Sequence, residues 1–324
     1  MQAAIEADWA ELKAVQFDES GFQTVEASQQ FVCGKSTIGF DSATGGISML
    51  KGPGGTNWAS AERQLAQPWY RNDNVEYYHQ FDKDYNGHDA GNFMKKGLNL
   101  TAMNSNATLQ KLQRKAGTTN TTFKLLMTMD PKVHTERGAP ATLEALVVVP
   151  HAASASGAVE IEYTLQWFDK TPCHAPETIW LRNSPNVKDA TAWRIDKLGS
   201  MVNPLDADLT KNNGGPRRTC DRSGTTCGVH LHAVDTGAFY SGSEGKLGLK
   251  SLDSVLVSIG DPLPAPTPLM VPDPLGGVHF SLVDNTWNTN YPEWYPFIEA
   301  ATATPFPGGE GDENSRFRFV ISIS

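Results

Sequence analysis

The sequence lacks several features that would place it in a common functional class. It contains no run of about 18 consecutive apolar residues, so no membrane-spanning helix is expected. Basic clusters are limited to Lys95-Lys96 and Arg217-Arg218, and the formal net charge is −9. We therefore expect neither a nucleic acid nor an anionic membrane surface as a partner.

Short catalytic and cofactor motifs are also missing. The chain has no G-x-S-x-G, no H-E-x-x-H, no phosphate-binding loop and no dinucleotide fingerprint. Its glycine-rich stretches, GPGG at 52–55 and NNGG at 212–215, precede no predicted helix and are interpreted as turns. No cofactor is predicted.

Cysteine is scarce, with four residues in the chain: Cys33, Cys173, Cys220 and Cys227. Cys220 and Cys227 enclose a short polar loop, CDRSGTTC, which favours a local disulfide over free thiols. A zinc site that adds His230 and His232 is the alternative. It is disfavoured because the cysteine spacing is wide and H-x-H is typical of strand alternation, so no metal site is predicted.

The predicted disulfide favours an oxidising, extracellular or lumenal location. Three N-glycosylation sequons, at Asn99, Asn106 and Asn120, point weakly the same way. The opening residues, MQAAIEADWAELKAVQF, contain acidic side chains and no continuous apolar core, so they do not form a signal peptide.

The same opening residues have apolar side chains at helical spacing: Ile5, Trp9, Leu12 and Val15. This spacing predicts a short amphipathic N-terminal helix. No composition shift divides the chain after residue 30. We therefore predict a helix and linker over 1–29 and one β domain over 30–324.

The remainder of the chain has the pattern of an all-β protein. The segment 159–168, VEIEYTLQWF, alternates apolar and polar residues and predicts a half-buried strand. GFDSATGGISML at 39–50 predicts a hairpin, and the alternating RFRFVISIS predicts a chain end paired into a sheet. Further candidate strands are 107–112, 121–129, 143–149, 178–181, 192–195, 229–234, 237–240, 246–249, 254–259 and 278–283. Many strands without βα alternation predict a large antiparallel sandwich.

The most distinctive stretch is NTWNTNYPEWYPF at 285–297. Aromatic rings offer faces to a pyranose, and neighbouring amides and carboxylates can bond to sugar hydroxyls. A second polar-aromatic stretch, 69–85, is predicted as a long loop at the same end of the domain. The alternative is that the aromatics of 285–297 are buried and plug the end of the sandwich.

These stretches supply the candidate site residues. The predicted glycan-facing residues are Trp287, Asn288, Asn290, Tyr291, Glu293, Trp294 and Tyr295, together with Tyr70, Arg71, His79 and Gln80. Candidate carboxylates for glycosidic chemistry are Asp73, Glu76, Asp82, Asp84, Asp284 and Glu293, although each is first interpreted as a solvated loop charge. Candidate histidines are His79, His88, His230, His232 and His279, and a hydrogen-bonded structural role is favoured for His232 and His279.

Several motifs together resemble a known family. They are IGFDSATGGISML at 38–50, WFDK at 167–170, APETIWL at 175–181, WRIDKLGSMVNP at 193–204, HLHAVDTG at 230–237 and GVHFSLVDNTWNTNYPEWYPF at 277–297, with RFRF following. In this order they resemble domain-of-unknown-function family 5054, whose members are similar to family 38 glycoside hydrolases of the α-mannosidase type. The resemblance implies a galactose-mutarotase-like super-sandwich that follows an α/β barrel.

That family's metal and aspartate nucleophile lie on the barrel, so no catalytic residue is assigned in this chain and its status as an enzyme stays open. The resemblance implies a carbohydrate-active protein whose β region packs on an upstream barrel or completes its glycan site. The alternative is a stand-alone carbohydrate-binding or structural module without catalysis.

Overall fold

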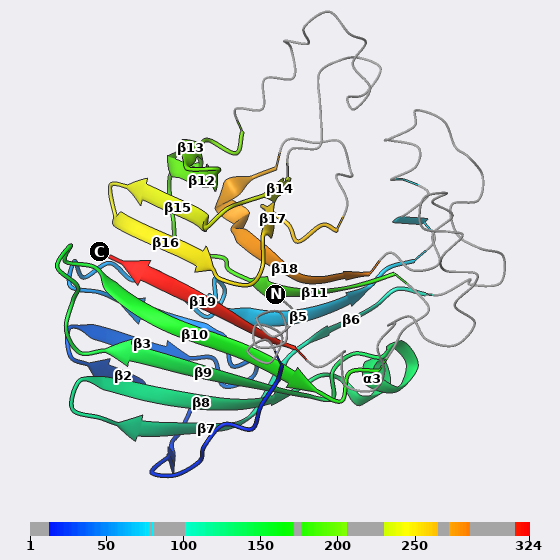
Figure 1. Cartoon of the computed structure of the whole chain (residues 1–324), viewed down its shortest axis with the longest axis horizontal. Helices are drawn as coiled ribbons and strands as arrows, with labels where there is room; N and C mark the ends of the chain where they lie inside the picture. Colours follow the sequence, from blue (N-terminus) through cyan, green and yellow to red (C-terminus); the bar gives the residue numbers. More distant parts are fainter. Residues whose placement is uncertain are drawn as a thin grey trace, which may run out of the picture.

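The structure is a computed structural model that describes residues 13–74, 76–77, 80, 101–171, 176–205, 230–264, 272–285 and 315–324. Within these ranges the chain is an all-β sandwich of antiparallel strands in three sheets, which confirms the predicted fold class (Figure 1). Residues 1–12, which hold most of the predicted N-terminal helix, lie outside the described residues. The segment 13–29 contains one short strand and no helix.

The largest sheet has ten strands in the order β1-β7-β8-β9-β10-β19-β16-β15-β12-β13. Their bounds are β1 Gln23–Thr24, β7 Thr108–Ala116, β8 Asn120–Thr128, β9 Thr142–Pro150, β10 Val159–Phe168, β12 Trp193–Lys197, β13 Ser200–Val202, β15 Gly237–Gly242, β16 Gly245–Ser251 and β19 Arg316–Ile323. The predicted strand at 159–168 is confirmed as β10. The predicted pairing of RFRFVISIS is also confirmed, since β19 lies between β10 and β16.

The second sheet has six strands in the order β14-β17-β18-β11-β5-β6. Their bounds are β5 Gln67–Asn72, β6 Met103–Asn106, β11 Glu177–Arg182, β14 Leu231–Ala233, β17 Leu256–Ile259 and β18 Val278–Asn285. The prediction of a loop starting at residue 69 was wrong for β5. Its inward residues are Pro68, Tyr70 and Asn72 rather than aliphatic side chains, so the usual strand period is hidden.

The core lies between the inner faces of these two sheets. Tyr163 and Phe319 of the ten-stranded sheet meet Phe280 of the six-stranded sheet, and the Phe280 and Phe319 ring centroids are 5.4 Å apart. A third sheet, formed by β2 (Gln30–Cys33), β3 (Ser36–Phe40) and β4 (Ile47–Lys51), contains the predicted hairpin. Phe31 and Phe40 of this sheet pack on Phe123 with centroids 5.0 and 5.2 Å away.

The stretch 98–150, predicted as entirely β, contains one helix, α3 (Pro131–Arg137). The Asp130 carboxylate accepts hydrogen bonds from the first-turn backbone amides, and Pro131 occupies the first turn. Gly138 ends the helix with a φ of 75°, a left-handed conformation that glycine adopts without strain. Two short 3₁₀ turns, η1 (Ala190–Ala192) and η2 (Pro274–Gly276), occur elsewhere.

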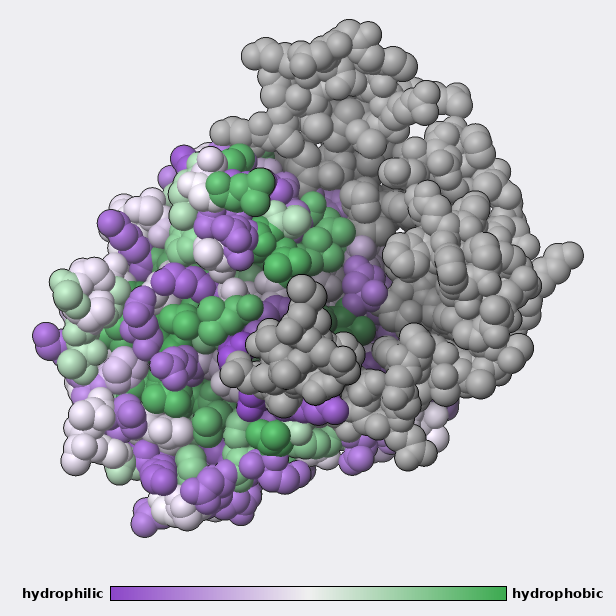
Figure 2. Space-filling view, viewed as in Figure 1, coloured by the Kyte–Doolittle hydropathy of each residue, from purple (hydrophilic) through white to green (hydrophobic). Residues whose placement is uncertain are grey.

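The chain before β1 crosses the outer face of the ten-stranded sheet, in blue in Figure 1. The Val15 N–H donates to Gln166 Oε1 at 3.1 Å, and Gln166 Nε2 donates to the Val15 carbonyl at 2.5 Å. Lys124 Nζ lies 3.0 Å from Glu19 and 3.4 Å from Glu144. These contacts bury Lys124, Glu144 and Gln166. Elsewhere on this face, hydrophilic and hydrophobic residues are interspersed (Figure 2), as expected for a partly solvated antiparallel sheet.

Candidate functional site

The outer face of the six-stranded sheet carries a row of polar side chains across four adjacent strands. Arg71 of β5 is paired with Asn104 of β6 and with Thr178 of β11, and Thr178 is paired with Asp284 of β18. Paired residues of neighbouring strands share a face, and Tyr70 and Ile179 beside them point into the core. We call Asn104, Arg71, Thr178 and Asp284 the polar row.

Asp73 extends the polar row just beyond the end of β5. Its carboxylate forms an ion pair with Arg71 Nε, and its Oδ2 is buried without a hydrogen-bond partner. Burial raises the pKa of Asp73, while the neighbouring Arg71 charge opposes that rise. Arg71 also lies over the Tyr77 ring at 4.5 Å. Asp73 is therefore a desolvated carboxylate with one oxygen, Oδ2, that lacks a hydrogen-bond donor.

Asp284 is the second carboxylate at this end of the sheet. Within the described part of the chain it makes no hydrogen bond and no ion pair. Solvent reaches the side chain, yet the protein around it disfavours its charge. Desolvation of the carboxyl by the surrounding protein raises the pKa of Asp284 to about 7, and the Asp73 carboxylate adds to the rise. At neutral pH, Asp284 can therefore both donate and accept hydrogen bonds.

An aromatic pair separates the polar row from a pocket on the same face. Trp69 and Trp180 are paired across β5 and β11, and Trp180 is fully buried, with its indole N–H donating to Thr178 Oγ1 at 2.8 Å. The next pair is Gln67 and Arg182. The Arg182 guanidinium lies over the Trp69 ring at 5.0 Å.

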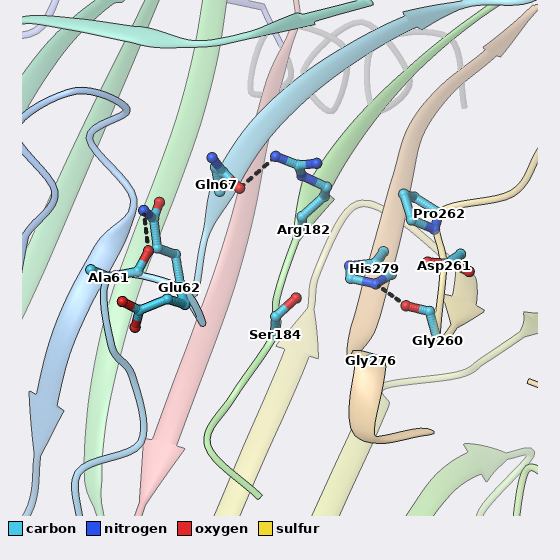
Figure 3. A pocket seen from close by; sticks show the side chains of 11 residues that line it. Ala61, Glu62, Gln67, Arg182, Ser184, Gly260, Asp261, Pro262, Gly276 and His279 are labelled. Atoms are coloured by element: carbon cyan, nitrogen blue, oxygen red, sulfur yellow. Dashed lines mark hydrogen bonds between the residues drawn. The ribbon is translucent and has the colours of Figure 1, made fainter. Parts of the chain in front are cut away.

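Arg182 lines a pocket of about 320 Å³, the arginine pocket. Figure 3 shows Arg182 bonded to Gln67, with Glu62 on one side and Asp261 and His279 on the other. Arg182 Nη2 donates to Gln67 Oε1 at 2.6 Å and to Asn106 Oδ1 at 2.5 Å. Burial lowers the pKa of Arg182 to about 10, so the side chain remains cationic at neutral pH.

His279 forms one wall of the arginine pocket but is not available for proton transfer. Its Nδ1 accepts the Asn183 N–H at 3.2 Å, so Nε2 carries the proton and donates to the Gly260 carbonyl at 2.7 Å. Burial lowers the pKa of His279 to about 4. The structural role favoured for His279 is confirmed, because both ring nitrogens are used and the ring is neutral.

Tyr70 does not lie on the predicted glycan-facing surface. It is buried on the inner face of β5, and its hydroxyl lies 2.7 Å from Glu177 Oε2. Lys170 Nζ lies 2.8 Å from Glu177 Oε1, so a buried ion pair closes this end of the core. Arg71 lies on the outer face of β5, and the side chain of Gln80 is exposed.

The other predicted site residues lie outside the described residues. They are Trp287, Asn288, Asn290, Tyr291, Glu293, Trp294, Tyr295, His79 and the cysteines Cys220 and Cys227. Of the candidate carboxylates, Asp73 and Asp284 are brought to one end of the sheet. Their interpretation as solvated loop charges was wrong for Asp73, which is buried; Asp284 is exposed as expected but belongs to β18 and not to a loop.

Sequence reasoning missed Thr178, Gln67 and Arg182. Thr178 lies in the predicted strand 178–181, and Arg182 directly follows it; continuing the alternation from Thr178 would have put both on one face. No local signal showed that this face carries a pocket. Among the residues that the structure describes, no group of three or more His, Cys, Asp or Glu side chains could hold a metal ion. Nor does any helix there have the length and apolar character needed to span a membrane.

Comparison with known proteins finds similarity among solved structures. No protein-family model matches the chain, and no curated protein sequence matches it. Among solved structures, an alpha-mannosidase from Enterococcus faecalis V583 matches with a TM-score of 0.48 and 9% sequence identity. The match covers 95% of this chain and 30% of that chain, so this chain spans less than a third of that protein's length.

Proposed function

We propose that this chain is the glycan-facing β-sandwich of a carbohydrate-active, glycoside-hydrolase-like protein, whose sugar-binding surface consists of Asp73 and the accessible members of the polar row, Asn104, Arg71 and Asp284. The observation that supports this proposal is the lack of partners on two neighbouring carboxylates. Asp73 Oδ2 is buried without a donor, and Asp284 makes no hydrogen bond among the described residues. A buried acceptor left unpaired costs about 1–3 kcal/mol, which a bound donor would recover.

Sugar hydroxyls fit these acceptors because each hydroxyl both donates and accepts. Asp73 and Asp284 would take hydroxyl protons, while Arg71 and Asn104 would donate to hydroxyl oxygens. The side chain of Asn104 is exposed and that of Arg71 is half-buried, so both can be approached from solvent. A purely cationic ligand would suit the carboxylates but not the guanidinium between them.

The polar-aromatic stretch at 285–297 follows Asp284 directly in the sequence. Its first residue, Asn285, ends β18 next to Asp284. The proposal therefore includes Trp294 and Glu293 as residues that contact the same glycan, with a ring face and a carboxylate respectively. If the stretch is instead a buried plug, Trp294→Ala will cost about 3–5 kcal/mol of stability. As a glycan contact it will weaken binding with little change in melting temperature.

The role of the surface in a longer protein follows from the family resemblance. An upstream barrel would carry the metal and nucleophile, and the sandwich would complete the glycan site beside it. We therefore propose that the chain alone binds glycans but does not hydrolyse them. Turnover of aryl glycosides by the purified chain, lost in Asp284→Asn, would contradict this proposal and would indicate that the carboxylates are catalytic.

A glycan array probed with the purified chain tests the proposal. We expect binding to at least one sugar class, reduced tenfold or more by Asp284→Asn and by Arg71→Met. Glu162→Gln, an exposed carboxylate on the ten-stranded sheet, is the matched control and should bind like the wild type. No binding by the wild type, or equal binding by Asp284→Asn, would refute the proposed surface.

A further inference from the structure

The arginine pocket holds a guanidinium that is in no direct ion pair with a described acidic side chain. Arg182 forms no ion pair among the described residues, and its two bonded partners, Gln67 and Asn106, are neutral amides. Its Nε is buried without a hydrogen-bond partner. A half-buried guanidinium normally has a carboxylate or phosphate beside it, because removing the charge from water is costly.

The guanidinium is held in place rather than mobile. Nη2 is fixed between the Gln67 and Asn106 side-chain oxygens, and the Trp69 ring lies beneath the plane at 5.0 Å. Nε and Nη1 remain as donors without an acceptor in the described part of the chain. A fixed cation with free donors, facing a pocket of about 320 Å³, is a preorganised anion site.

The pocket's other residues decide which anion fits. Glu62 and Asp261 also line it, and neither is paired with Arg182. Their two negative charges disfavour a sulfate or phosphate dianion, so a fitting ligand pairs one carboxylate with Arg182 and offers hydroxyl donors to Glu62 and Asp261. Gln64 and Ser184 line the remaining wall with neutral polar groups that can bond to hydroxyls.

We infer that the arginine pocket binds an acidic sugar, such as a uronic or sialic acid, with the sugar carboxylate on Arg182. One strand pair on this face, Trp69 and Trp180, separates Arg182 from the polar row. Trp180 and Thr178 are both fully buried, so the pocket is a separate subsite on this sheet. The choice of a sugar as its ligand rests on the proposed function.

The test compares each acidic sugar with its uncharged form. The probes are oligosaccharides ending in glucuronate, galacturonate or sialic acid, each beside its methyl ester, with affinities measured by calorimetry. For at least one pair we expect the wild type to bind the acid tenfold or more tightly than the ester. Arg182→Gln should abolish that preference while leaving ester binding unchanged, and Arg182→Lys should keep part of it.

Arg194→Gln is the matched control, because it removes the same charge from an exposed position on β12. It should retain the full preference for the acid. Equal wild-type binding of acid and ester would overturn the carboxylate site while leaving the proposed glycan surface intact. A preference that survives in Arg182→Gln would overturn it too, and binding of neither form would count against both proposals.

Discussion

Acidification should destabilise this protein through His279, and the size of the effect follows from the structure. The ring is neutral in the folded state, with its pKa lowered from 6.5 to about 4 by burial and by the nearby Arg182 charge. In the unfolded chain the ring takes up a proton near its ordinary pKa. The unfolded state therefore binds more protons between pH 4 and 6.5, and stability is lost as the pH falls through that window.

A pKa gap of this size corresponds to about 3 kcal/mol at most. Roughly 2 kcal/mol of it should be lost between pH 7 and pH 4.5. Asp284 acts in the opposite direction, because its raised pKa stabilises the folded state at low pH and that contribution is lost as the pH rises towards 7. The wild-type pH profile alone therefore mixes the two effects.

The His279→Gln variant separates them. A glutamine can accept from the Asn183 N–H and donate to the Gly260 carbonyl, as the neutral ring does, but it does not titrate. Urea unfolding of both proteins from pH 7 to 4.5 should show the wild type losing about 2 kcal/mol more than the variant. His151→Gln, at a partly exposed position, is the control and should follow the wild type. Parallel profiles for the wild type and His279→Gln would refute the assignment.

Three further predictions concern buried residues near the candidate site and the predicted disulfide. Lys170→Met should cost about 3–5 kcal/mol in urea unfolding because it leaves Glu177 buried and unpaired, and a second change, Glu177→Leu, should recover much of that loss. Trp180→Ala should lower stability by about 3–5 kcal/mol, since the indole is fully buried. A change below about 1 kcal/mol would contradict this, because it would mean that neighbouring side chains move in and leave no cavity. Mass spectrometry of an unreduced digest should show Cys220 bonded to Cys227, and two free thiols there would refute the predicted disulfide.

The parts of the fold predicted from sequence are those where local alternation coincides with burial. β10 alternates buried and exposed residues over most of its length, and β19 shows the same period. β5 was missed because its inward residues are proline, tyrosine and asparagine. α3 was missed because seven residues are too few for an apolar period, although Asp130 and Gly138 marked both its ends.

The candidate site could be predicted only in part, for a different reason. Asp73, Asp284 and Arg71 were candidates by residue type and by their nearness to aromatic stretches. That they share one row depends on the pairing of β5, β11 and β18, which lie far apart in the chain. Strand register between distant segments is set by tertiary packing, so residue types alone could not bring Arg71, Thr178 and Asp284 into one row.

The central position of β19 has a consequence for how the protein is made. Remove β19 from the strand order, and the ten-stranded sheet becomes two separate sheets, one ending at β10 and the other at β16. During synthesis both of those edges are translated before Arg316–Ile323 is available to pair with them. A nascent chain therefore exposes two unpaired strand edges, at β10 and β16, which can pair with other nascent chains and cause aggregation. We expect the ten-stranded sheet to be completed only after β19 has left the ribosomal exit tunnel.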